Sequence, residues 1–307
     1  MIIYVKFNFA IYFACRDITN VFVPPTIKQI NSFAFSNCLN LDEVEFSNDC
    51  EINTIKTNAF SHSSIDHILI PKSVEYIEKN AFSYCNKLKT LQFHDDSKIS
   101  VFESSLFFRS SIENLSIPSN IETFREGWCN STEKLINISI SPNNNNFTFL
   151  DDNKKIIVGK SNKTKNFYDV LEFACRDINK VLIPSTIKRI SPFAFSECHN
   201  LSKIEFSHDS QLASIGNDAF AFCNVEKIFI PNNVKNIGLN AFQGCKRLKS
   251  IEFLGDELTI ASSCFSKCSY LLVASFPNSN IVFINNDAFV FTSKYFTLFI
   301  AASAKII

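Results

Sequence analysis

Residues 65–88 read IDHILIPKSVEYIEKNAFSYCNKL, and this stretch decides the fold. It contains an apolar strand motif that ends in Pro71, then a V-x-x-I step, then the pair Ala81-Phe82 followed three residues later by Cys85. Its last residue begins the next copy of the same pattern. A period in the twenties is typical of a solenoid, in which each coil buries its apolar side chains against its neighbours.

The strand motif has apolar residues at i, i+3 and i+5 and recurs at intervals of 23 or 24 residues, apart from one interval of 43 residues between Leu135 and Ile178. Its copies start at Ile18, Leu41, Ile65, Leu88, Ile112, Leu135, Ile178, Leu201, Val225, Leu248, Leu271 and Tyr295. This period indicates a leucine-rich-repeat solenoid of the α/β class. We expect strands on a concave face, and short helical or 3₁₀ turns or irregular segments on the convex face.

A longer period divides the chain in two. Residues 13–93 align without gaps with residues 173–253, with 38 identities in 81 positions. We therefore expect two blocks of six coils each, at 1–140 and 170–307, the second without a polar cap at its C-terminal end. The insert at 141–169 contains FTFL, the turn DDNK and KIIVG, which predict a β-hairpin. This insert is either a rigid joint or a hinge.

The Ala-Phe dipeptide of the repeat, which we call the AF pair, recurs along the chain and supplies the predicted core. Ala permits close approach of the backbone while Phe fills the inside of the coil. The core phenylalanines are Phe35, Phe60, Phe82, Phe195, Phe220, Phe242 and Phe289. A cysteine follows three residues after the AF phenylalanine in six copies, at Cys38, Cys85, Cys198, Cys223, Cys245 and Cys268. Since Ser63 and Ser110 take this position elsewhere and the total of 11 Cys is odd, we interpret them as buried free thiols, not a disulfide framework.

The sequence has no recognisable catalytic, cofactor or metal motif. The five histidines form no HExxH pattern, there is no G-x-S-x-G, and six glycines provide no phosphate-binding loop. Cys264 and Cys268 lie four residues apart without histidine partners, unlike zinc ligands. Asp residues that end the even coils favour turn capping over a calcium ladder. We predict a non-enzymatic protein without cofactor or metal.

Charge and hydropathy limit the possible partners. The 30 basic and 30 acidic residues cancel, so we expect no nucleic acid and no anionic membrane surface as a partner. No apolar run reaches the roughly 20 residues of a transmembrane helix. The N-terminal MIIYVKFNFAIYFAC resembles a signal-peptide core, but its FACRDI at 13–18 recurs at 173–178. We therefore assign it to the first coil, and export by another route remains open.

Side chains at i+4 of each copy point away from the core, because side chains alternate along a strand. The candidate binding residues in this row are Phe22, Glu45, Leu69, Gln92, Leu182, Glu205, Phe229 and Glu252. Apolar residues on the odd coils alternate with polar or acidic ones on the even coils, a mixture that suits recognition of a protein or glycoprotein. The alternative is a merely solvated face.

The combination L/I-x-x-I-x-I-P, V-x-x-I and AF-x-x-C-x-x-L resembles the BspA-type leucine-rich repeat of bacterial and protozoan surface antigens. The resemblance covers Phe13 to Ile300. It implies a cell-surface or secreted adhesin that contacts host cells or matrix, and it brings no catalytic residues. Six N-x-S/T sequons, at Asn114, Asn130, Asn137, Asn146, Asn162 and Asn200, agree with exposure outside the cell. An intracellular, cytoplasmic scaffold is the alternative, and the oligomeric state is open.

Overall fold

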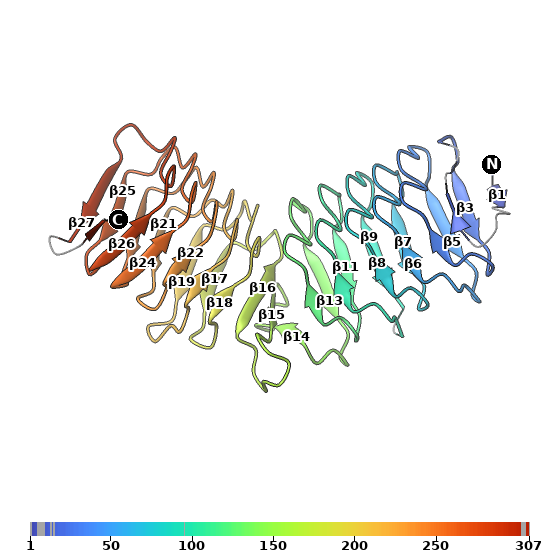
Figure 1. Ribbon diagram of the computed structural model, residues 1–307, viewed down its shortest axis with the longest axis horizontal. Helices are drawn as coiled ribbons and strands as arrows, with labels where there is room; N and C mark the ends of the chain where they lie inside the picture. The colour runs from blue at the N-terminus through green and yellow to red at the C-terminus, as the bar shows by residue number, and fades with distance from the viewer. Residues whose placement is uncertain are drawn as a thin grey trace. The chain divides into compact units, whose positions relative to one another are not determined.

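The computed structural model describes residues 2–4, 10–12, 14, 16–94, 96–301 and 305–306. The chain divides into two compact units, unit 1 over Met1–Thr148 and unit 2 over Phe149–Ile307. Each unit is a stack of coils in which parallel strands lie side by side (Figure 1). Much of the signal-like segment, including Phe13 and Cys15 of the first FACRDI, lies outside the described residues.

Four-residue strands, which we call the long strands, begin two residues after every start of the sequence motif. In unit 1 they are β3 (Asn20–Val23), β5 (Glu43–Phe46), β7 (His67–Ile70), β9 (Thr90–Phe93), β11 (Asn114–Ile117) and β13 (Asn137–Ile140). In unit 2 they are β17 (Lys180–Ile183), β19 (Lys203–Phe206), β21 (Lys227–Ile230), β23 (Ser250–Phe253), β25 (Val273–Phe276) and β27 (Thr297–Ile300). The predicted parallel-strand solenoid is confirmed. One further strand, β1 (Ile2–Tyr4), pairs in parallel with β3.

A second ladder, on another side of the coils, is built mainly from two-residue strands at the V-x-x-I step. In unit 1 these strands are β2 (Ala10–Ile11), β4 (Gln29–Ile30), β6 (Thr54–Ile55), β8 (Tyr76–Ile77), β10 (Val101–Phe102) and β12 (Thr123–Phe124). In unit 2 they are β18 (Arg189–Ile190), β20 (Ser214–Ile215), β22 (Asn236–Ile237), β24 (Glu257–Ile260), β26 (Ile281–Ile284) and β28 (Lys305–Ile306). In most coils this step ends in an isoleucine that is buried inside the coil, such as Ile55, Ile77 and Ile237.

The expected helical or 3₁₀ turns are wrong, because no residue in the described part of the chain is helical. AF segments instead form tight turns with two residues of positive φ, one directly before Ala and one two residues after Phe. Around Phe82 these are Asn80 at 59° and Tyr84 at 57°. Left-handed residues cannot belong to a right-handed helix. The N–H groups of the turn therefore bond to the next coil, as when Phe60 donates to the Ala81 carbonyl at 2.9 Å.

The AF phenylalanines form a continuous stack of rings inside each unit. In unit 2, ring centroids are 4.9 Å apart for Phe195 and Phe220, 5.1 Å for Phe220 and Phe242, and 5.2 Å for Phe242 and Phe265. Interplanar angles stay below 10° in all three pairs. Of the predicted core phenylalanines, Phe289 alone is half-buried and the other six are fully buried. Each ring thus takes its packing surface from the coils before and after it.

Proline weakens the backbone pairing between every second pair of adjacent long strands. After an even-coil strand the next residue donates its N–H to the preceding strand, as Ser47 does to the Val23 carbonyl at 3.0 Å. Odd coils have proline at this position, such as Pro71, which has no N–H to donate. Accordingly β3 and β5 pair over four residues and β9 and β11 over two, whereas β5 and β7 lie in separate sheets. The structural repeat is a pair of coils.

The insert forms hairpins at the start of unit 2. Leu150, directly after β14 (Phe147–Phe149), donates its N–H to the Ile156 carbonyl at 2.8 Å, as the predicted hairpin requires. Strand β15 (Ile156–Gly159) then pairs antiparallel with β16 (Val170–Ala174), a partner that the sequence pattern did not indicate. Strand β16 leads in parallel to β18 and so starts the second ladder of unit 2.

We expect Phe242→Ala to lower the free energy of unfolding by about 3–5 kcal/mol, because it leaves a cavity between two stacked rings. Denaturant unfolding followed by circular dichroism measures this loss. The control Phe291→Ala removes a ring that is 74% exposed and should change stability by less than about 0.5 kcal/mol. Equal losses for the two variants would contradict the stacked-ring core.

Candidate functional site

The long strands place the predicted binding residues in register on the outer side of the sheet, in what we call the strand-face row. Direct neighbours are Phe22 and Glu45, Leu69 and Gln92, Leu182 and Glu205, and Phe229 and Glu252. The side chains of Leu69, Leu182 and Phe229 are 53%, 60% and 46% exposed, and Phe22 and Glu252 are half-buried. Each unit therefore carries its own row of alternating apolar and polar side chains.

A second row lies two residues before the first and contains lysines in unit 2. Lys180 stands directly opposite Lys203, and Lys227 follows on β21. Lys203 forms an ion pair with Glu205 at 2.8 Å, and the Lys227 ammonium lies 4.4 Å from the centre of the Phe229 ring. This row was not among the predicted binding residues, although its i+2 spacing already placed it on the same face.

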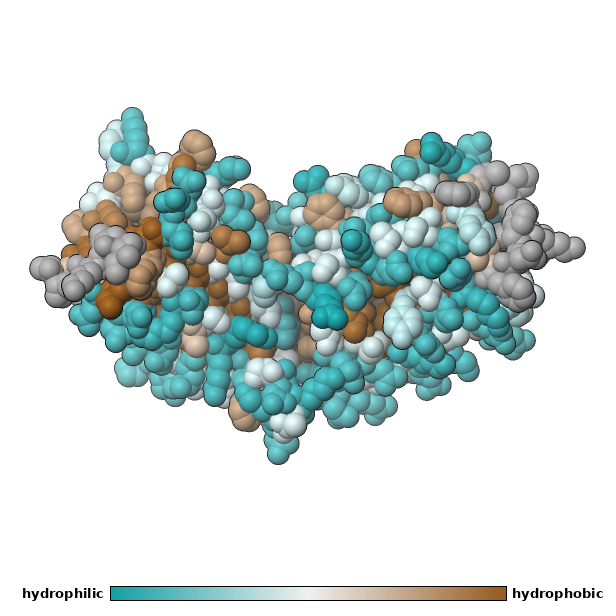
Figure 2. Space-filling model, in the orientation of Figure 1, coloured by the Kyte–Doolittle hydropathy of each residue, from teal (hydrophilic) through white to brown (hydrophobic). Residues whose placement is uncertain are grey.

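The strand-face row of unit 2 continues into an apolar surface over the last coils. Beyond Glu252 the register passes through Ser275 to Phe299, which is 56% exposed. Tyr270 and Tyr295 on the adjoining turns are also exposed. Figure 2 shows brown, apolar atoms gathered over the coils of β25 to β27. Exposed apolar groups among charged ones are typical of a protein-binding surface.

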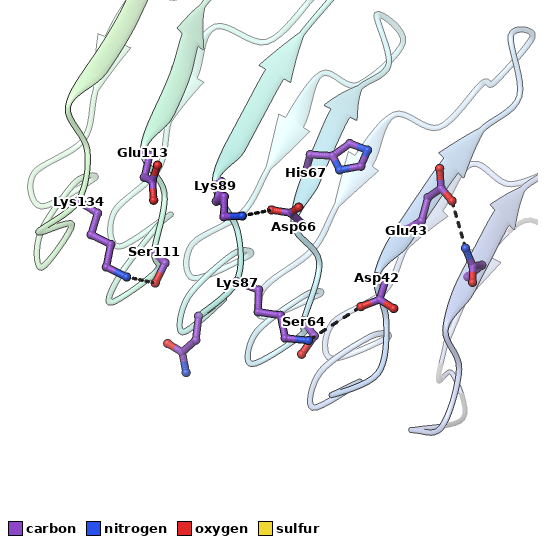
Figure 3. A pocket seen from close by; sticks show the side chains of 12 residues that line it. Asp42, Glu43, Ser64, Asp66, His67, Lys87, Lys89, Ser111, Glu113 and Lys134 are labelled. Atoms are coloured by element: carbon purple, nitrogen blue, oxygen red, sulfur yellow. Dashed lines mark hydrogen bonds and ion pairs between the residues drawn. The ribbon is translucent and has the colours of Figure 1, made fainter.

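In unit 1 a shallow polar groove of about 550 Å³ lies at the N-terminal ends of the long strands (Figure 3). Lys89 pairs with Asp66 at 3.7 Å across one seam, and Lys87 reaches Asp42 at 3.9 Å. These charges balance one another from coil to coil. The groove thus resembles the polar rim around an interface and contributes solvated ion pairs of small energy.

The cysteines three residues after the AF phenylalanines form a column of buried hydrogen-bond donors. The Sγ atoms of Cys223, Cys245 and Cys268 each lie 3.0 Å from the carbonyl of the AF phenylalanine in an earlier coil. Burial raises the pKa of the Cys85 thiol to about 12, so it stays protonated and can donate. Ser63 and Ser110 take the same buried position in other coils: the Ser63 hydroxyl lies 3.6 Å from the Cys85 Sγ, whereas the Ser110 hydroxyl has no hydrogen-bond partner among the described residues.

No cysteine in the described ranges forms a disulfide, and Cys50 is the one among them that is partly exposed. The described residues contain no group of three or more His, Cys, Asp or Glu side chains that could hold a metal ion. They also contain no helix of the length and apolar character that crossing a membrane requires.

The loop between β15 and β16 is held closed by one buried carboxylate. Asp169 accepts hydrogen bonds from the N–H and hydroxyl of Ser161, both at 2.8 Å, and from the Lys165 ammonium at 2.5 Å. Burial acts against the charged form, but these donors outweigh it and lower the pKa of Asp169. The loop presents Phe167 to solvent beside Lys165 and Lys188.

A comparison with family models identifies the repeat. The model described as "BspA type Leucine rich repeat region (6 copies)" matches residues 6–136 and 170–295. The chain belongs to the BspA-type leucine-rich repeat family. The matched BspA-type repeats cover most of the long strands, and the unmatched segment between them contains β14, β15 and the loop closed by Asp169. No curated protein matches the sequence.

Solved structures share the fold of these BspA-type repeats. A leucine-rich repeat protein from Eubacterium ventriosum is 24% identical, covers 95% of this chain and 74% of its own length, and has a TM-score of 0.76. A leucine rich cell surface protein from Faecalibacterium prausnitzii is 21% identical, with coverages of 94% and 80% and a TM-score of 0.74. The pneumococcal vaccine antigen PcpA is 19% identical, with coverages of 95% and 82% and a TM-score of 0.61.

We expect the stability of the protein to fall as the pH rises from 9 towards 12, because unfolded thiols ionise near their ordinary pKa while a thiol with the raised pKa of folded Cys85 does not. Stability is fully present below pH 9, and each such thiol adds a loss of about 1.4 kcal/mol per pH unit above it. Cys85→Ser should remove one such contribution, as measured by urea unfolding between pH 8 and 11. Cys50→Ser, at a half-buried thiol, should change the slope less, and an identical slope in Cys85→Ser and the wild type would contradict the column.

Proposed function

We propose that this protein is a non-enzymatic binding protein of the cell surface or secreted fraction, and that its strand faces attach to a protein or glycoprotein of a host cell or matrix. The observation that carries the proposal is the strand-face row, where apolar side chains remain exposed on a rigid sheet. Leu182 and Phe229 stand on alternate strands with Glu205 between them in the row. Burying two such side chains on a partner is favourable by about 1.5–3 kcal/mol each.

The family and its structural neighbours support a place outside the cell. One neighbour is described as a cell surface protein and another as a vaccine antigen. Of the sequon asparagines at the starts of long strands, Asn137 is exposed and Asn114 is half-buried. The second candidate is an intracellular scaffold, which is favoured by core cysteines that form no disulfide within the described residues.

Charge reversal tests the strand face of unit 2. The double variant Glu205→Lys/Glu252→Lys should weaken binding to a panel of immobilised matrix glycoproteins roughly tenfold, because both carboxylates belong to the proposed interface. Its Tm should stay unchanged, since neither side chain is fully buried. The control Asp209→Lys/Glu257→Lys makes the same charge change away from the row. Wild-type binding by the first variant would contradict the proposal.

Surface labelling separates the two candidate functions. An epitope-tagged copy in intact source cells should react with an impermeant biotin reagent, and its apparent mass should fall after deglycosylation if the sequons carry glycans. A copy that stays unlabelled in intact cells, unglycosylated and in the cytosolic fraction would favour the scaffold.

A further inference from the structure

Strand β17, the first long strand of unit 2, has a neighbour on one side only. It pairs with β19, and the sheet formed by these two strands contains no other strand of the described chain. The equivalent strand of unit 1, β3, is paired on both sides, with β5 and with the extended segment β1. Since β3 and β17 occupy equivalent positions of a duplicated sequence, β1 shows that this edge accepts a parallel strand.

The backbone pattern identifies the free groups on β17. The carbonyls of Asn179 and Ile183 accept hydrogen bonds from Ser202 at 2.9 Å and Ser207 at 3.0 Å, on the side of β19. Because successive residues of a strand point their backbone groups to opposite sides, the N–H and C=O of Lys180 and Leu182 point to the free edge. Such an edge is a ready template for an added strand.

A hollow of about 570 Å³ runs along this edge. Ile178, Val181 and Leu182 line it on the side of β17, and Asp151 and Lys155 of the β14–β15 turn and its flank line it as well. Leu182 belongs to both the hollow and the strand-face row. A segment bound in the hollow would therefore continue the proposed binding face.

The charges on β17 and β19, as distinct from Asp151 on the other wall of the hollow, indicate what kind of segment fits this edge. Lys155 is paired with Asp177 at 2.7 Å and Lys203 with Glu205 at 2.8 Å, whereas Lys180 forms no ion pair with any described residue. Lys180 also stands directly opposite Lys203, and like charges in this position destabilise a sheet.

In unit 1 the residue at the position of Lys180 has a hydrogen-bond partner within the unit. Asn20, the counterpart of Lys180, donates a hydrogen bond to Glu43 at 3.1 Å. An acidic side chain supplied from outside would give Lys180 the partner that it lacks.

We propose that the free edge of β17 binds an extended, acidic peptide segment of a partner protein, which adds as a parallel strand and places a carboxylate beside Lys180. The inference rests on the proposed function, because it names the form in which a protein partner reaches the strand face of unit 2. A second copy of this chain is the less suitable occupant. In the register of β1 on β3, Ile2 stands opposite Asn20, so the β1 of another copy would bring an isoleucine to Lys180.

Fluorescence anisotropy with the full chain tests the proposal. The probe is the labelled peptide TVTVEVTVT, compared with TVTVKVTVT and with two N-methylated forms that block alternate sets of amides. The acidic peptide should bind at least tenfold more tightly than the lysine peptide. Methylation of one set should abolish binding and methylation of the other should leave it unchanged, because a strand pairs through one edge. Equal effects of the two methylated forms would overturn the strand-addition mode.

Variants locate the site on β17. Leu182→Pro removes an N–H that points to the free edge, and proline is tolerated at such positions, so peptide binding should be lost with little change in Tm. The matched Leu182→Ala keeps the N–H and should retain most of the binding. Lys180→Glu should bind the lysine peptide more tightly than the acidic peptide. This measurement tests the proposal even if the proline variant unfolds. Unchanged peptide binding by Leu182→Pro and Lys180→Glu would overturn the assignment to β17.

Two further outcomes separate this inference from the proposed function. Lys180→Glu that loses the acidic peptide but still binds matrix glycoproteins through the strand-face row supports an edge site that acts independently of this row. Loss of matrix binding in Glu252→Lys, at a residue that does not line the hollow, bears on the proposed function alone. A peptide of residues 1–8 of this chain that binds more tightly than the acidic probe would overturn the acidic partner in favour of a second copy.

Discussion

The stacking of one buried phenylalanine on the next is the interaction on which each unit depends. A coil of 23 or 24 residues is too short to enclose a core of its own, so its ring has to pack against the coils before and after it. The coil before also provides the carbonyl for the cysteine thiol, and the coil after provides the acceptor for the phenylalanine N–H. Stability is therefore a sum over contacts between adjacent coils. It does not belong to any single coil.

This dependence also explains the shape of the turn around each AF pair. Some residues with positive φ are of types that tolerate it, such as Asn58, Asn80 and Gly244. Others, such as Phe33 and Phe193, have no such preference and adopt positive φ because the turn must aim its N–H groups at the next coil. The spacing AF-x-x-C is equally compatible with one turn of helix. Sequence pattern alone therefore could not exclude a helix, and the expectation failed there.

The long strands and the core were predictable because period and residue type act locally. Apolar residues at i, i+3 and i+5, with Pro or Asp beyond, determine where each strand begins and ends. The hollow beside β17 was not predictable, because it depends on β15 pairing with β16 and not with a long strand. The lack of an ion-pair partner for Lys180 was likewise not predictable, because it depends on two coils. The residue opposite Lys180 is Lys203, which is 23 positions away and carries the same charge.

The two duplicated blocks show which residue positions the fold constrains and which positions can vary. The AF phenylalanines of the aligned residues are the same in both blocks, as in Phe82 and Phe242, because a change there removes contacts with two coils. The outer row differs: Asn20, Glu43 and His67 of unit 1 correspond to Lys180, Lys203 and Lys227 of unit 2. Exposed side chains on a sheet make few contacts, so most substitutions there change stability by no more than about 0.5 kcal/mol. One scaffold can therefore present an acid-containing face in one unit and a lysine-containing face in the other, and the two faces can select different partners while the ring stack stays the same.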